Sequence, residues 1–124
     1  MASHQILMQR IYDSERLPGC RVLVDRLWPR GVKKEAAALD LWAKDATPSS
    51  ALRIWYHSHP EEFKDFSERY LEELRANPKA SEFASWCREK LETEDVILLF
   101  ATRKKENHIQ VLKAWLEEKL SGAA

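Results

Sequence analysis

The chain has 124 residues, enough for one hydrophobic core and too few for a second. Apolar residues make up 44% and charged residues 32%, a balance that is typical of globular proteins and excludes intrinsic disorder. Lysine plus arginine equals aspartate plus glutamate at 20 each, so the whole molecule exerts no long-range attraction on nucleic acid or an anionic membrane. We therefore expect a single domain over residues 1–124, in which any preference for anions is local.

The N-terminal third predicts two strands. Residues 5–12 mix apolar and polar side chains as a strand does, and turn residues follow them. Residues 21–27 contain three consecutive apolar residues, which indicates a strand covered on both faces, as in a parallel sheet. Pro29 and Gly31 end this second strand. The link between the two strands is too short for a crossover helix, so their relative direction stays open.

The middle of the chain predicts helices. Residues 34–39 favour a short helix, and Ser49 after Pro48 supplies a turn and a cap for the next one. Pro60 opens a third helix, which Asn77 and Pro78 end. Its apolar residues share one face: Phe63, Phe66, Tyr70, Leu71 and Leu74. A fourth helix repeats the pattern with Phe83, Ala84, Cys87 and Leu91.

The last third predicts a buried strand over residues 96–101 and a helix over residues 106–120. The order of elements indicates an α/β protein with a small, mainly parallel sheet of about three or four strands flanked by helices. Ligands of such sheets bind at the carboxyl ends of the strands. The apolar run at 96–101 is too short to span a bilayer and no signal peptide is evident, so we expect a cytoplasmic protein with no membrane partner.

Polar side chains follow two of the predicted strands and define a candidate site. After the second strand come Asp25, Arg26, Trp28 and Arg30. After the third comes Arg103, in a loop that leads into a helix opening near Asn107 and His108. A strand that turns into a helix aims backbone N–H groups and the positive end of the helix dipole at one point.

The candidate residues have distinct expected roles. Arg26, Arg30 and Arg103 are placed to grip a phosphate or carboxylate, with Arg103 pointing at it most directly. His108 is a candidate acid or base, and Asp25 can orient it or accept its proton. Trp28 and Asn107 complete the substrate-binding set, with Trp28 offering an aromatic face to a planar ligand. In the alternative, structural interpretation, Asp25 pairs with an arginine, Trp28 packs under its loop and His108 is structural.

Metal and thiol chemistry are disfavoured. His57 and His59 have no further histidine or cysteine placed to complete a metal site, and His59 before Pro60 suits a cap or packing role. Cys20 and Cys87 lack a CxxC or metal-ligand spacing, so we expect two reduced, buried thiols. We expect no cofactor and no bound metal.

The run Val22 to Val32, with the sequence VLVDRLWPRGV, is distinctive, and shorter segments accompany it in order: QRIYD at 9–13, LWAKD at 41–45, PS at 48–49, LR at 52–53, and NH at 107–108. Together they resemble the YeaO-like family of uncharacterised bacterial proteins (domain of unknown function 488), over nearly the whole chain. The resemblance implies an α/β sheet domain without an agreed activity. Glu106 departs from the family pattern, which usually has a histidine there.

A remoter resemblance is to the rhodanese and cysteine-phosphatase group, in which a strand ends in Val-Asp-Arg and a later loop cradles an anion. In that group the loop carries a nucleophilic cysteine, whereas residues 101–106 contain none. Thiolate attack at this loop is therefore disfavoured.

Two classes of function remain open from sequence. The first is an enzyme, without a catalytic cysteine, that acts on a small anionic substrate containing a phosphate or nucleotide. The second is a non-catalytic regulatory module that binds a ligand, a nucleic acid or a protein. The neutral net charge disfavours nucleic acid without excluding it, and the aromatic content is compatible with a homodimer. The substrate, the reaction and the oligomeric state cannot be read from the sequence.

Overall fold

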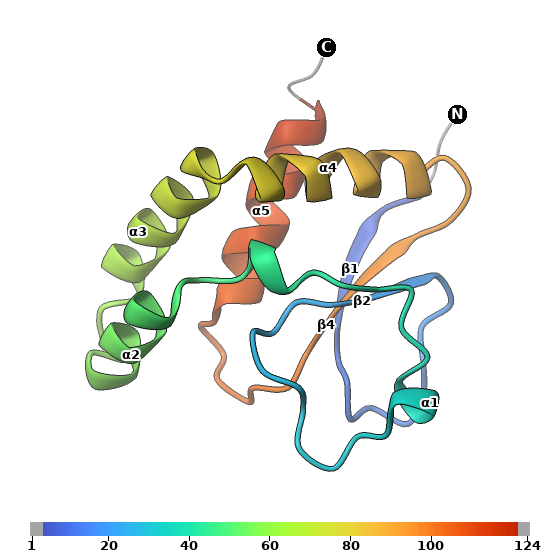
Figure 1. The fold of residues 1–124 in the computed structure, drawn as a ribbon, viewed down its shortest axis with the longest axis horizontal. Coiled ribbons are helices and arrows are strands. Elements are labelled where there is room, and N and C mark those ends of the chain that lie inside the picture. The colour runs from blue at the N-terminus through green and yellow to red at the C-terminus, as the bar shows by residue number, and fades with distance from the viewer. Residues whose placement is uncertain (1–3, 122–124) are drawn as a thin grey trace.

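The computed structural model describes residues 4–121, which form one sheet with helices packed against it (Figure 1). The strands are β1 (Ile6–Arg10), β2 (Cys20–Leu23), β3 (Leu41–Trp42) and β4 (Val96–Phe100). All strand pairs are parallel, in the order β1-β4-β2-β3. This confirms the predicted α/β fold with a small parallel sheet.

The helices lie in the regions of the chain where the sequence predicts them, although not all of their first residues agree. They are α1 (Lys34–Ala37), α2 (Ser50–Ser58), α3 (Phe63–Ala76), α4 (Pro78–Lys90) and α5 (His108–Ser121), with a 3-10 turn η1 (Lys44–Ala46) before α2. Ser49 caps α2, because its side chain accepts a hydrogen bond from the amide of Leu52. Asn77 ends α3 and also caps α4, whose first residue is Pro78. No helix in residues 4–121 has the length and apolar character needed to cross a bilayer.

The two faces of the sheet are covered differently. The larger core packs Val22 and Leu98 against the long helices α2–α5. The smaller core packs Leu23 and Leu99, which point to the opposite face, against residues 28–42 and the short α1. Apolar residues on both faces explain why the second and last strands read as continuous apolar runs.

The open question about strand direction is resolved: β1 and β2 are parallel, and β4 lies between them. The nine residues 11–19 return along the sheet without a helix, and an extended segment of that length spans about 30 Å. Gly19 ends this link at a φ of +145°, and a Cβ atom there would lie 2.6 Å from the carbonyl oxygen of Asp95. The close approach requires glycine at this position.

Several boundaries differ from the prediction. Pro60 does not open the third helix, because Pro60 and Glu61 form a turn, Glu62 is the N-cap and α3 begins at Phe63. The second strand ends at Leu23 rather than residue 27, and the last helix begins at His108 rather than near 106. The two-residue strand β3 was not predicted, because two residues carry no detectable periodicity. The early end of β2 and the late start of α5 follow from the side-chain contacts of Asp25 and of Asn107, respectively, which are described below.

Candidate functional site

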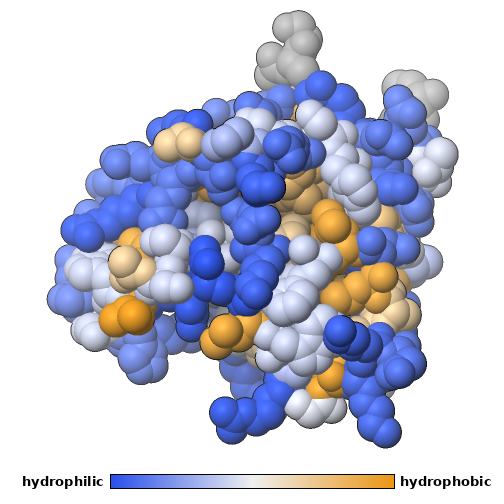
Figure 2. Space-filling view, viewed as in Figure 1, coloured by the Kyte–Doolittle hydropathy of each residue, from blue (hydrophilic) through white to orange (hydrophobic). Residues whose placement is uncertain are grey.

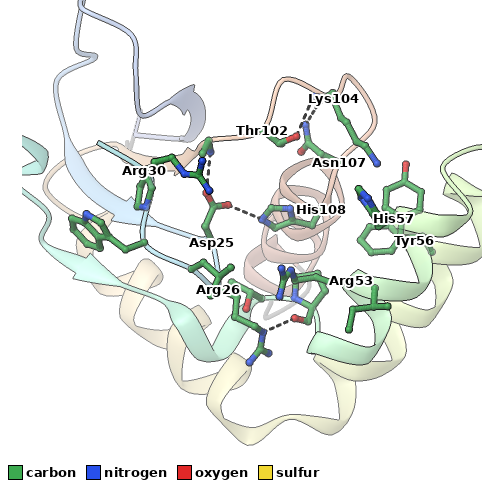
Figure 3. Close-up of a pocket in the computed structure, with 18 of the residues that line it drawn as sticks. Asp25, Arg26, Arg30, Arg53, Tyr56, His57, Thr102, Lys104, Asn107 and His108 are labelled. Carbon is green, nitrogen blue, oxygen red and sulfur yellow. Dashed lines mark hydrogen bonds and ion pairs between the residues drawn. The ribbon is translucent and has the colours of Figure 1, made fainter. Parts of the chain in front are cut away.

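A cavity of about 690 Å³ lies at the carboxyl ends of the strands. Its walls come from the chain after β2, from helix α2 and from the β4–α5 loop (Figure 3). Among its lining residues are Tyr12, Asp25, Arg26, Leu27, Trp28, Arg30, Arg53, Ile54, Tyr56, His57, Lys104, Asn107 and His108. The site predicted from two strand ends is therefore a single cavity with a third wall, α2.

Asp25 and His108, the predicted acid–base pair, meet in this cavity. Asp25 Oδ1 lies 3.3 Å from His108 Nε2, and their side chains are 15% and 17% exposed. The other oxygen, Oδ2, accepts a hydrogen bond of 2.9 Å from the amide of Ala101. The Asp25 carbonyl also accepts a bond of 2.7 Å from Trp42 Nε1. Asp25 thus joins the ends of β2, β3, β4 and the start of α5.

These contacts explain why β2 ends early. In the parallel register of β2 and β4, Val24 N donates to Leu99 O, and the next bond would run from Ala101 N to Val24 O. His108 Nε2 lies 2.6 Å from that carbonyl instead, and Ala101 N bonds to the Asp25 carboxylate. Two side chains therefore replace one rung of the sheet.

The contact to Val24 also fixes the tautomer of His108. A carbonyl oxygen only accepts hydrogen bonds, so Nε2 carries a hydrogen and donates it towards Val24 O and the nearby Asp25 carboxylate. Proton exchange by neutral His108 is thereby confined to Nδ1. The pair can position an imidazole for acid–base chemistry, but equally it can serve as a structural crosslink.

Asn107 caps helix α5. Its Oδ1 accepts a bond from Ile109 N at 2.9 Å, its Nδ2 donates to Lys104 O at 2.7 Å, and its own amide donates to Gln110 Oε1 at 3.2 Å. This arrangement resembles a capping box, except that Oδ1 accepts from the second amide of the helix rather than the third. Asn107 lines the cavity, and the cap uses two of the backbone N–H groups at the start of the helix, those of Asn107 and Ile109, within the chain.

Four basic side chains line the cavity: Arg26, Arg30, Arg53 and Lys104. None of them forms an ion pair with an acidic side chain in the part of the chain that the structure describes. Arg26 Nε donates to Pro48 O at 2.9 Å, which holds that side chain along its wall. The single carboxylate among the lining residues is Asp25, which is already hydrogen-bonded. The cavity is locally cationic in a molecule of zero net charge.

Arg103, which was expected to point at the ligand, is exposed and does not line the cavity, so the structure does not bring it together with the other predicted binding residues. The amide of Lys104 donates to Thr102 Oγ1, forming a tight turn that presents Lys104 to the cavity instead. Lys104 Nζ lies 4.7 Å from the ring centre of Tyr56, on the opposite wall. Glu106, where the family pattern differs, is exposed and offers its carbonyl to the Tyr56 hydroxyl.

The segment around Trp28 is held from several sides. Trp28 Nε1 donates to Val32 O at 2.7 Å, and its ring meets Trp42 edge to face with centres 5.3 Å apart. Tyr12 donates to the carbonyl of Arg30 at 2.8 Å, and Gly31 follows at a φ of +79° that other residues rarely adopt. Trp28 therefore packs under its loop, as in the structural interpretation, while it also lines the cavity.

Sequence reasoning missed Arg53 and His57 as lining residues. They are four residues apart on α2, beside the inward-facing Leu52 and Tyr56, so they share one helix face. Their spacing is visible in the sequence, but the position of α2 across the strand ends is not. The hydroxyl of Tyr56 donates to Glu106 O, and burial together with the charge of Glu106 raises the pKa of this phenol.

The remaining histidine and cysteine predictions concern packing. His59 stacks on Trp55 with ring centres 4.8 Å apart and ends α2, which confirms a capping and packing role. Residues 4–121 contain no group of three or more side chains suited to hold a metal ion.

Both cysteines are free and buried. Burial raises the pKa of Cys87 to about 12, and burial with the Asp40 carboxylate raises that of Cys20 to about 11, so both thiols are protonated near neutral pH.

The fold and the cavity define a parallel α/β protein with a basic site at the carboxyl ends of its strands. A family model described as "Inactive DUF488-N3 subclade" matches residues 5–124, and the chain belongs to this family. It is 39% identical over 113 residues to the uncharacterized protein YeaO of Escherichia coli. The matched region covers 90% of this chain and 96% of that protein.

A second relative is the uncharacterized protein Rv3073c of Mycobacterium tuberculosis, 43% identical over 79 residues, with 63% of this chain and 67% of that protein covered. No solved structure matches the chain significantly. The YeaO-like resemblance is therefore confirmed, whereas nothing in these comparisons supports the remoter likeness to rhodaneses and cysteine phosphatases.

Proposed function

We propose that the chain binds a small anionic ligand in this cavity and holds it without converting it. The observation that carries the proposal is the set of four basic side chains, Arg26, Arg30, Arg53 and Lys104, which line the cavity without an acidic partner among the described residues. Arginine suits such a role because its planar fork matches phosphate and carboxylate oxygens. A binding role agrees with the word "inactive" in the family description and with two protonated, buried thiols.

The test is a thermal-shift screen with inorganic phosphate, pyrophosphate, nucleotides and phosphorylated sugars, followed by titration calorimetry of each stabilising compound. A bound anion should stabilise the protein by about 2.7 kcal/mol at a hundred times its Kd. Lys104→Gln and Arg53→Gln should each weaken binding at least about tenfold, since each removes a charge-assisted contact. Neither substitution should lower the unfolding temperature noticeably, because both side chains are exposed.

Arg103→Gln is the matched control for Lys104→Gln, because it removes an exposed charge from the same loop but outside the cavity. It should leave binding nearly unchanged. An equal loss of affinity in both variants would mean that the loop attracts anions only through its total charge and not through a contact of Lys104. The proposed site would then be wrong.

A second candidate function, an acid–base enzyme, is favoured by the 3.3 Å contact of Asp25 and His108 in the same cavity. Each compound that binds should be incubated with the protein and followed by NMR. Under the binding proposal the ligand stays unchanged. Conversion by the unaltered protein that His108→Gln abolishes while ligand binding persists would establish the enzyme instead.

A further inference from the structure

Two exposed aliphatic side chains line the same cavity as the basic residues. Leu27 is 64% and Ile54 is 67% exposed, the highest values among the large apolar residues in the described part of the chain. Single exposed apolar residues are common on protein surfaces and need no explanation. Here both belong to the lining of one cavity, which makes them parts of a single site.

Leu27 and Ile54 each directly follow a basic residue in the sequence, and the two pairs belong to different walls of the cavity. Arg26 and Leu27 belong to the chain after β2, and Arg53 and Ile54 belong to α2. Figure 2 shows apolar surface over α2 and over the chain that follows β2, set in hydrophilic surroundings. Both walls therefore offer a positive charge beside an aliphatic group.

The volume of the cavity also exceeds what a simple anion needs. Sites for drug-sized organic molecules have volumes of roughly 300–1,000 Å³, and the 690 Å³ of this cavity lies in the middle of that range. An inorganic phosphate has five heavy atoms and would leave most of the space, and both aliphatic side chains, in contact with water. A ligand with an apolar group of its own would use both parts of the lining.

We propose that the ligand is an amphipathic small organic anion, whose charged group contacts the basic side chains and whose apolar group packs against Leu27 and Ile54. This inference rests on the proposed anion-binding function and adds the chemical class of the ligand. Two aliphatic side chains supply only a small part of the roughly 800 Å² per partner that stable protein interfaces bury. The apolar lining thus fits a small molecule better than a protein surface.

The experiment compares two phosphate monoesters that share one headgroup, methyl phosphate and n-hexyl phosphate, by titration calorimetry. Hexyl phosphate should bind about tenfold more tightly, because every buried methylene adds favourable free energy. Its binding should also show the more negative heat-capacity change, which marks apolar burial. Equal affinity of the two esters would overturn the inference and leave the anion-binding function intact.

Substitutions then assign the gain to the two residues. Leu27→Ser with Ile54→Ser should reduce the advantage of hexyl phosphate to less than about twofold and leave the affinity for methyl phosphate unchanged. The control, Met8→Ser with Leu17→Ser, removes exposed apolar groups outside the cavity and should preserve the full advantage. Because Leu27 and Ile54 are exposed, the double variant should keep its unfolding temperature.

Three other outcomes would overturn the inference. A gain from the hexyl chain that survives in the Leu27→Ser and Ile54→Ser variant would place the apolar group elsewhere. A dimer that this variant converts to a monomer in sedimentation would assign the two side chains to contact between copies of the chain. Absence of binding by both esters would count against the proposed function itself and thus against the ligand class as well.

Discussion

Asp25 uses every acceptor group that it has to connect separate elements. Its two carboxylate oxygens face Ala101 N and His108 Nε2, and its carbonyl accepts from Trp42. Because the carboxylate is only 15% exposed, water cannot readily replace these partners. The residue is therefore needed for the shape of the cavity whether or not it takes part in chemistry.

We expect Asp25→Asn to lower the free energy of unfolding by about 1–3 kcal/mol, the cost of leaving a buried polar group without a matching partner. The amide oxygen can still accept from Ala101 N, but the amide nitrogen then faces the N–H of His108, so two donors meet. Urea unfolding measures the loss. Asp13→Asn, in an exposed turn, is the control and should stay within about 0.5 kcal/mol of the unaltered protein. Similar values for the two variants would show that the crosslink is unimportant.

The location of a predicted site residue could be read from the sequence where the residue comes soon after a strand. Asp25 and Arg26 follow a strand directly, so their place at the carboxyl edge follows from the strand itself. Arg103 and Lys104 lie in a loop, where a turn formed by the Thr102 hydroxyl decides which of the two faces the cavity. No periodicity describes such a turn, so the sequence could not show that Lys104 rather than Arg103 lines the cavity.

At the scale of elements, the capping residue Asn107 sets the first residue of helix α5. The amide of Asn107 donates to Gln110 Oε1, and Asn107 Oδ1 accepts from Ile109 N. Asn107 Nδ2 also closes the loop by donating to Lys104 O. The start of α5 thereby fixes His108 beside Asp25. The prediction placed this start about two residues early because the apolar pattern of a helix does not mark its first turn.

Asn107→Ala should lower the free energy of unfolding by about 0.5–2 kcal/mol, the usual cost of removing an N-terminal cap. Asn107→Asp keeps the acceptor for Ile109 N and should lose less, although it gives up the donor to Lys104 O. Thermal unfolding followed by circular dichroism distinguishes the two variants. If Asn107→Ala is as stable as the unaltered protein, the hydrogen bonds of this cap contribute nothing net to the fold.

Other elements show the same limit of sequence reasoning. The helices α3 and α4 are long and amphipathic, so their pattern predicts them well. The strand β3 has two residues and is set by pairing with β2. Helix α2 was predicted as a helix, yet its role as a cavity wall depends on packing between distant segments, which one sequence does not reveal.

At the scale of the whole molecule, the charge is zero but unevenly placed. Four basic side chains share a cavity with one carboxylate, so acidic residues elsewhere balance them. Composition predicted that any preference for anions would be local, and the cavity has a local excess of basic over acidic side chains among its lining residues. The two faces of the sheet differ too, because long helices cover one and the segment 28–42 covers the other.

This difference between the faces predicts unequal stability along the chain. Within residues 26–39, Val32 N donates to Pro29 O, Ala37 N to Lys33 O and Ala38 N to Lys34 O, and all three carbonyls lie three or four residues away in the sequence. The segment can therefore open without breaking the sheet or α3 and α5, whose apolar residues lie in the larger core. Its anchors include the contact of Trp28 with Trp42 and two side-chain hydrogen bonds to its carbonyls, from Tyr12 to Arg30 O and from Arg21 to Ala37 O.

Hydrogen exchange followed by mass spectrometry should show amides of residues 26–39 exchanging about a hundredfold or more faster than those of α3 and α5, which open only with global unfolding. Trp28→Phe should accelerate the segment further, because it removes the donor to Val32 O and reduces the contact with Trp42, while α3 and α5 change much less. Leu71→Ala, in the larger core, is the control and should accelerate α3 and α5 as well. Uniform exchange along the chain, or equal acceleration of all segments by Trp28→Phe, would mean that both faces open as one cooperative unit.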